Sequence, residues 1–306
     1  MAPLRNTAPD DPPSAWAPAP VRPPQSDRPA PVIALAAVFV LSLVLVAVRS
    51  PDGVVASADP GFEPVPLPLL LVPAAACIAL TLLLPRGAGR AAVAVRRPRS
   101  VRAETSGLLA LAVGFTLAVP ILPRPEDYVL LKAAMFMLIP SVVLGEILRR
   151  RGASVEIERP DIPAWVPLLP ALVLGVTATV GPFSPGPPAT WPPLAMLLIG
   201  ASATAVTAGL GEELLYRRFL QTRLEALCGP WTALLAVSLL FGLMHVFTHG
   251  AGPLWASAAQ AIALQGVTGV ALGLLWRRWR RLWPCVLAHV LLNGLTVLLH
   301  LVGLTG

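Results

Sequence analysis

Long, uncharged apolar runs dominate this sequence of 306 residues. A helix that crosses the hydrocarbon core of a bilayer needs about 20 apolar residues, because each residue advances the helix by only ~1.5 Å. Only 13% of the residues are charged, roughly half the share of a soluble domain. We therefore predict an all-α, polytopic transmembrane helix bundle of about eight to nine spans. The nine runs are 31–48, 67–84, 106–123, 128–148, 162–180, 192–212, 231–248, 254–276 and 284–302.

Every second connection between these runs is rich in arginine. They cluster between the second and third runs, after the fourth, after the sixth, and between the eighth and ninth, whereas the connections 49–66 and 181–191 are poor in arginine. Cytoplasmic loops carry the excess of basic residues. We predict a protein of the cell membrane with a cytosolic N-terminus and an extracellular C-terminus. The arginines of these connections account for the net charge of +7. We therefore expect membrane lipids as partners and no nucleic acid.

The remaining features of composition are structural. Residues 1–30 are rich in proline and are expected to form a disordered cytosolic tail. Cys77, Cys228 and Cys285 lie far apart without CxxC spacing, which favours free, packed thiols over a disulfide framework or a structural zinc site. Gly269 and Gly273 form a GxxxG pattern, which indicates close packing of two helices.

Two charged residues of the fourth run have simple structural explanations. Glu146 is three and four residues before Arg149 and Arg150, so an ion pair at the inner end of the helix is expected. Lys132 is expected to extend its side chain toward Glu126 or Asp127 at the other end. We predict no catalytic role for either residue.

The stretch Gly211-Glu-Glu-Leu-Leu-Tyr-Arg-Arg218 is different, because two carboxylates end an apolar run. Glu213 and Arg217 are four residues apart on a helix and are predicted to form an ion pair. Glu212 points about 100° away and has no such partner. A half-buried carboxylate without a counter-charge is suited to act as a general base. The stretch alone leaves an alternative open, an interfacial charge cluster in which Glu212 reaches Arg218 or water.

The histidines add weight to the first possibility. The sequence has four, of which His245 lies in the seventh run and His289 in the ninth. Asn293 follows His289 by four residues, so both project from one helix face. Polar side chains on an otherwise apolar membrane helix face the interior of the bundle. A glutamate, a histidine and a His/Asn pair on three separate runs are hard to explain as packing residues.

Taken in order, these residues resemble the three motifs of the CPBP family of intramembrane glutamic endopeptidases, which is related to the eukaryotic CAAX prenyl endopeptidase. The motifs are Glu212-Glu213-x-x-x-Arg217, Phe241-x-x-x-His245 and His289-x-x-x-Asn293. The resemblance covers roughly 192–302, so we divide the membrane part into N-terminal helices, 31–160, and a catalytic core, 161–306. Arg218 departs from the family pattern, in which glycine is frequent, and is expected to alter packing at the cytosolic mouth.

The resemblance implies a peptidase that needs no metal or cofactor and cleaves a peptide or membrane-protein substrate near the cytosolic face. Glu212 would activate water with help from His245, and His289 and Asn293 would hold the oxyanion. Glu213, Arg217 and Phe241 would support the site. Oligomeric state and substrate identity are not encoded in any pattern that we recognise.

Two alternatives remain open at this stage. Glu212, His245 and His289 could instead form a three-ligand zinc site, although His245 and His249 have HExxH spacing without the glutamate. The bundle could also be a non-enzymatic scaffold, an immunity-type protein or a transporter. The peptidase hypothesis has a geometric difficulty. His245 lies fifteen residues after Pro230, about 22 Å along a helix, and His289 only five after Pro284, about 8 Å. The hypothesis requires all four site residues to meet within about 10 Å.

Overall fold

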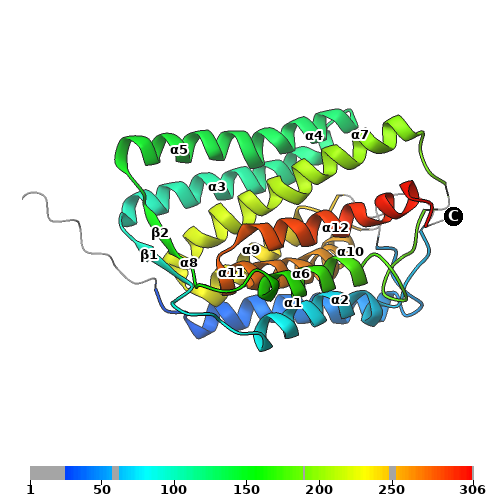
Figure 1. Cartoon of the computed structure of the whole chain (residues 1–306), viewed down its shortest axis with the longest axis horizontal. Coiled ribbons are helices and arrows are strands. Elements are labelled where there is room, and N and C mark those ends of the chain that lie inside the picture. The colour runs from blue at the N-terminus through cyan, green and yellow to red at the C-terminus, as the bar shows by residue number, and fades with distance from the viewer. Residues whose placement is uncertain (1–24, 57–61, 189, 248–252, 305–306) are drawn as a thin grey trace, which may run out of the picture.

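Every predicted apolar run forms a helix in the computed structural model, which describes residues 25–56, 62–188, 190–247 and 253–304. The helices pack side by side as one elongated bundle (Figure 1), which confirms the all-α class. Residues 1–24, most of the predicted tail, lie outside the described residues. The helices are α1 (Pro29–Arg49), α2 (Leu67–Leu83), α3 (Pro98–Ala118), α4 (Pro125–Ala133), α5 (Ile139–Arg151), α6 (Trp165–Thr177), α7 (Leu194–Thr204), α8 (Thr222–Cys228), α9 (Pro230–Leu243), α10 (Leu254–Ala261), α11 (Val267–Trp279) and α12 (Leu282–Leu301).

Several of these helices continue into one another through π-helical segments. The segment η3 (Ala205–Gln221) joins α7 to α8, η2 (Ala134–Leu138) joins α4 to α5, and η4 (Ile262–Gly266) joins α10 to α11. A short 3₁₀ turn, η1 (Val119–Ile121), ends α3. Because π-helical geometry is rare and often marks functional sites, the length of η3, 17 residues, sets this helix apart.

The length of the helices does not confirm the predicted number of spans. Within the described part of the chain, six helical stretches are long and apolar enough to cross a membrane, whereas α2, α6 and α9 are shorter apolar helices. The runs of α6 and α9 overestimate the helices because apolar residues continue past the helix ends at Thr177 and Leu243. Hydrophobicity therefore predicted where the helices are, but not how long each one is.

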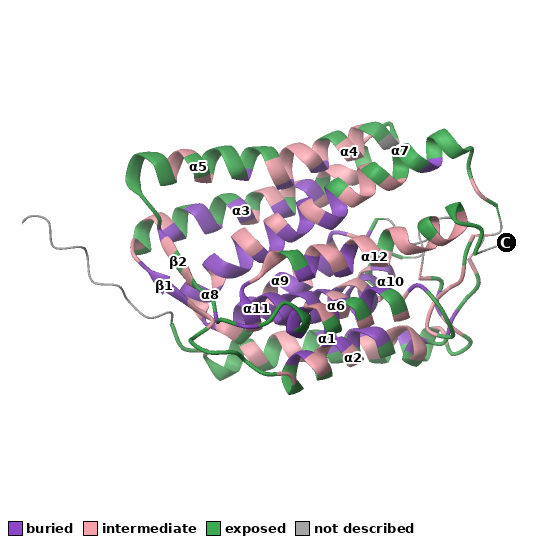
Figure 2. Cartoon of the chain, viewed as in Figure 1, coloured by how far each residue is buried: buried purple, intermediate pink, exposed green. Residues whose placement is uncertain are grey.

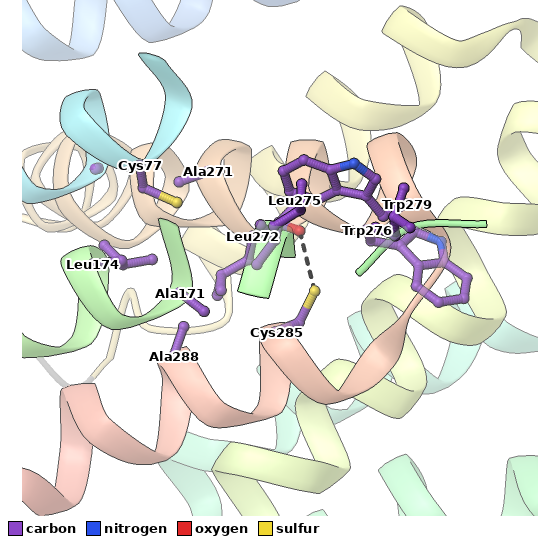
Figure 3. Close-up of a cluster of buried hydrophobic side chains, with 13 residues drawn as sticks. Cys77, Ala171, Leu174, Ala271, Leu272, Leu275, Trp276, Trp279, Cys285 and Ala288 are labelled. Atoms are coloured by element: carbon purple, nitrogen blue, oxygen red, sulfur yellow. Dashed lines mark hydrogen bonds between the residues drawn. The ribbon is translucent and has the colours of Figure 1, made fainter. Parts of the chain in front are cut away.

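The core of the bundle lies where α2, α6, α11 and α12 meet. Buried residues concentrate on the inner helices, and exposed ones on the outward faces of α1, α2 and α5 (Figure 2). Trp276 and Trp279 of α11 lie at one side of this cluster, Cys77 lies at the other, and Cys285 lies between them (Figure 3). The Cys285 thiol donates a hydrogen bond to the Leu272 carbonyl oxygen at 3.5 Å. All three cysteines are free thiols, as predicted, and Cys77 and Cys285 are fully buried.

Small residues allow two helix pairs to approach closely. A Cβ atom on Gly273 of α11 would lie 2.5 Å from Leu234 Cδ1 of α9, and one on Gly269 would lie 3.2 Å from Ser238 Cα. The GxxxG pattern therefore marks the α9–α11 contact, as predicted. A Cβ on Gly209 of η3 would lie 2.4 Å from Val290 Cγ2 of α12, so η3 and α12 are equally close.

A small antiparallel sheet, which no sequence pattern predicts, caps one end of the bundle. Strand β1 (Ala92–Val95) pairs with β2 (Val155–Glu158) next to the start of α3 and the end of α5 (Figure 1). The arginine-rich connections gather at this end, while α12 ends at the opposite one. The segregation of arginine agrees with the alternation in the sequence. Which end faces the cytosol remains a prediction.

Candidate active site

The charged residues of η3 are buried in the middle of the bundle. Glu213 and Arg217 are both fully buried, and Glu213 Oε2 lies 3.1 Å from Arg217 Nε. The predicted pair is therefore present. The other oxygen, Glu213 Oε1, lies 2.8 Å from Nδ1 of His289 on α12. Glu213 thus fixes the positions of a guanidinium and an imidazole from two different helices.

Glu212 has a partner, contrary to the prediction from helix geometry. Its Oε1 forms an ion pair with the ammonium group of Lys132, and both side chains are buried. Lys132 lies on α4 and donates a second hydrogen bond to Tyr128 Oη at 3.1 Å. The expected extension of Lys132 toward Glu126 or Asp127 is therefore wrong, and the argument for Glu212 as a base can no longer rest on a missing counter-charge. The energetic reason is simple, since two buried charges are far less costly together than apart.

The second oxygen of Glu212 is in a different situation. Oε2 lies 3.8 Å from His289 Nε2, which is beyond hydrogen-bond distance. It accepts no hydrogen bond from the described residues although it is buried. His289 therefore bridges the two carboxylates, bonded to Glu213 through Nδ1 and directed at Glu212 through Nε2.

The ring of Phe241 joins the two histidines to this cluster. Its centroid lies 5.4 Å from that of His245 and 5.9 Å from that of His289. Arg217 Cζ lies 4.6 Å from the same centroid, a cation–π contact. His245 also interacts electrostatically with Glu212. The two histidines therefore meet at one aromatic ring, and the separation expected for helices that begin at the same depth does not apply.

The apolar run predicted that His245 lies inside a helix, and this prediction is wrong. Helix α9 ends at Leu243, and His245 belongs to the turn that follows, with Nδ1 2.9 Å from the Phe241 carbonyl oxygen. His249 lies outside the described residues. The last histidine, His300, stacks on Trp191 with ring centroids 4.0 Å apart, near the end of α12 and away from Glu212.

Asn293 is on the same face of α12 as His289, but it is exposed. No hydrogen bond joins it to another described residue. The structure thus brings together Glu212, Glu213, Arg217, Phe241, His245 and His289, and leaves Asn293 one turn further along α12 at an accessible position.

The zinc alternative is not supported by the positions of these side chains. Among the described residues, no group of three or more histidine, cysteine, aspartate or glutamate side chains is arranged to hold a metal ion. His245 reaches the cluster through the Phe241 ring, and one oxygen of Glu212 is engaged by Lys132.

Lys132 is the residue that sequence reasoning missed. The sequence does mark this residue as unusual, because it is the single lysine of the chain and lies in an apolar run. Nothing in the local pattern could match it to Glu212, since the pair depends on how α4 packs against η3. With Lys132 and Arg217, the cluster has two cations for two carboxylates. Besides Glu212 Oε2, the two terminal nitrogens of Arg217 are buried without a hydrogen-bond partner among the described residues.

Comparison with known proteins gives one match. Residues 191–295 match the family model described as type II CAAX prenyl endopeptidase Rce1-like. No curated protein and no solved structure matches the chain. The matched segment contains η3, α9 and most of α12, and thus every motif on which the resemblance was based. The match bears out the resemblance to the CPBP and CAAX-protease family over this segment, about a third of the chain, and supports a membrane protease of the CAAX type in general terms.

Proposed function

Because residues 191–295 belong to an Rce1-like protease family, we propose that this protein is a glutamic intramembrane endopeptidase with Glu212 as the general base. The observation that carries the proposal is the asymmetry of Glu212. One oxygen is held by Lys132, and the other is buried, without a hydrogen bond from the described residues, and directed at His289. A carboxylate held at one oxygen can take a proton at the other.

The reaction follows from this arrangement. Glu212 Oε2 removes a proton from water, and the hydroxide attacks the carbonyl carbon of the scissile peptide bond. The tetrahedral intermediate breaks the C–N bond when Glu212 returns the proton to the leaving amine. No covalent acyl-enzyme forms, and the products are a carboxylic acid and an amine.

His289 is the proposed donor to the oxyanion. Its Nδ1 is fixed by Glu213 at 2.8 Å, and in a protonated imidazole Nε2 donates as well. Donors already positioned in a dry site stabilise developing charge more strongly than water does. Asn293, one turn along the same face, is proposed as the second donor, and its accessible position suits contact with a substrate. His245 is proposed to orient the water beside Glu212.

The test uses cells that lack the chromosomal copy and express either wild-type protein or Glu212→Gln. New peptide ends are identified by mass spectrometry, and proteins that co-purify with Glu212→Gln identify trapped substrates. We expect the cleavage rate of such a substrate to fall by about 10²–10⁴-fold in Glu212→Gln. The matched control is Glu146→Gln, because Glu146 is half exposed and pairs only with neighbouring arginines.

Three outcomes would contradict the proposal. Equal cleavage by wild type and Glu212→Gln would remove Glu212 as the base. Identical sets of peptide ends in all strains would favour a scaffold or immunity-type protein. Cleavage that stops on addition of phenanthroline and returns with zinc would show a metalloprotease.

A further inference from the structure

An apolar groove lies between α3 and α5. The groove has a volume of about 1020 Å³. It is lined by side chains of both helices, namely Gly107, Leu108, Leu111, Ile139, Val143 and Ile147. None of these residues belongs to the candidate active site. From Arg97 to Leu111 the groove follows α3 for roughly 21 Å, given a rise of ~1.5 Å per residue.

The groove opens on a surface that faces lipid. Val142, Val143 and Leu148 of α5 are exposed by 60%, 50% and 56%. In a helix that crosses a membrane such residues contact acyl chains. Helices α3 and α5 lie at one edge of the bundle (Figure 1), so a lipid can enter the groove from the bilayer without crossing the core.

One end of the groove is basic. Arg97, Arg99 and Arg151 line it where α3 begins and α5 ends, and none of them has an ion-pair partner among the described residues. The carboxylate at this end, Glu104, is already engaged. It accepts hydrogen bonds from Ser100, Ser154 and Arg223 at 2.8, 2.7 and 2.6 Å.

Arg97 gives the most specific indication of a ligand. Its Nη2 atom is buried and has no hydrogen-bond partner among the described residues. A buried guanidinium nitrogen without an acceptor is costly, and phosphate oxygens are the acceptors that arginine binds best. An apolar channel with this arginine among the residues that line its basic end suits a phospholipid, whose acyl chain and phosphate follow in that order.

We propose that the α3–α5 groove binds one anionic phospholipid, with its phosphate on Arg97, Arg99 and Arg151 and an acyl chain along Gly107, Leu111 and Val143. Basic pockets between membrane helices are suited to anionic headgroups. The lipid has to be anionic because the choline or ethanolamine of a zwitterionic lipid would add a further cation beside the three arginines.

Native mass spectrometry of the full-length protein tests the site. The protein is delipidated in detergent and titrated with phosphatidylglycerol or phosphatidylcholine. We expect one phosphatidylglycerol to bind, about fivefold more weakly in Arg97→Gln, since one basic residue near a membrane surface contributes about that factor. Gly107→Leu should abolish binding, because a Cβ at Gly107 meets nothing within 4 Å and the new side chain extends into the groove without disturbing the fold.

Matched controls separate the site from general effects. Arg102→Gln removes an exposed arginine from α3 outside the groove, and Gly200→Leu adds the same side chain at an equally open glycine of α7. Both should bind phosphatidylglycerol as wild type does. Equal binding by Gly107→Leu and wild type would overturn the proposal. So would equal affinity for phosphatidylcholine, or displacement of phosphatidylglycerol by a prenylated peptide, which would assign the groove to a substrate.

Discussion

At the scale of single residues, the ion pair between Lys132 and Glu212 is the least expected contact. Both side chains are buried, and loss of one partner of a buried pair leaves a charge without compensation. Such a loss typically costs about 3–5 kcal/mol, whereas replacement of both partners by neutral groups costs far less. The pair can therefore be tested through stability, independently of any cleavage assay.

We predict that Lys132→Met lowers the free energy of unfolding by about 3–5 kcal/mol, because Glu212 is left buried without its cation. The double variant Lys132→Met/Glu212→Gln should recover most of the loss. Thermal unfolding in detergent micelles, followed by tryptophan fluorescence, measures both. Glu146→Gln, which breaks exposed pairs only, should change stability by less than about 1 kcal/mol. A double variant no more stable than Lys132→Met would show that the two charges are not coupled.

Phe241 is the second residue whose role can be isolated. Its ring contacts Arg217, His245 and His289 at once. Phe241→Leu keeps an apolar side chain of similar volume, so we expect a modest loss of stability, about 1–2 kcal/mol. The cleavage rate of a trapped substrate should fall by at least tenfold, because the two imidazoles lose their common support.

The control for this prediction is Phe39→Leu. Phe39 is buried in α1, and its ring lies next to Gly266 of η4. The Phe39→Leu variant should lose about as much stability as Phe241→Leu and keep its cleavage rate. If both variants lose cleavage equally, Phe241 acts only through general packing.

The residue scale also shows where sequence reasoning ends. Glu213 and Arg217 were paired correctly because they are four residues apart, and a helix brings such residues together whatever surrounds it. The same spacing rule leaves Glu212 unpaired, because it cannot detect a partner that lies on another helix. Contacts that depend on tertiary packing are invisible to spacing rules, and a lone lysine in an apolar run was the only available signal.

At the scale of elements, the contact between η3 and α12 sets the geometry of the site. Glu212 and Glu213 come from η3, and His289 comes from α12. The two helices touch at Gly209, directly beside Val290, which follows His289 in sequence. Any increase in their separation displaces His289 from both carboxylates.

We predict that Gly209→Ala lowers the cleavage rate by about tenfold to a hundredfold, since a displacement near 1 Å can cost that much. The new methyl group would lie 2.4 Å from Val290 Cγ2, so the Val290 side chain or α12 itself has to shift. Gly200→Ala is the matched control, on the same continuous helix and with nothing within 4 Å of the new Cβ. A cleavage assay on a trapped substrate compares the two. Equal cleavage rates in the two variants would show that the η3–α12 contact accommodates the methyl group without displacing His289.

Elements differ in how well the sequence predicts them. Each apolar run forms a helix as predicted, because its hydrophobicity can be recognised from its own residues without knowledge of the tertiary packing. The sheet of β1 and β2 was missed because four-residue strands in arginine-rich connections carry no periodic signal. The π-helical form of η3 is not predicted because no residue pattern distinguishes it from an α-helix.

At the scale of the whole molecule, the family segment does not contain the whole site. The match begins at residue 191, yet Lys132 on α4 completes the charge balance around Glu212. The proposed division into N-terminal helices, 31–160, and a catalytic core, 161–306, therefore separates chain segments rather than independent units. A truncated protein that begins near residue 161 should lose the cation that Glu212 needs.

The orientation in the membrane is a property of the whole bundle, because every helix must insert consistently. Arginine-rich connections gather at the end that carries β1 and β2 (Figure 1), and positive loops are retained in the cytosol. We predict that Arg90→Cys, at an exposed position of this end, is shielded from a membrane-impermeant maleimide in intact cells. Asp52→Cys, exposed between α1 and α2, should be labelled. Both are made in a Cys228→Ser background, since Cys77 and Cys285 are fully buried. After permeabilisation, both positions should react equally. The reverse pattern would place the arginines outside the cell, and cleavage near the cytosolic face would then have to be abandoned together with the predicted topology.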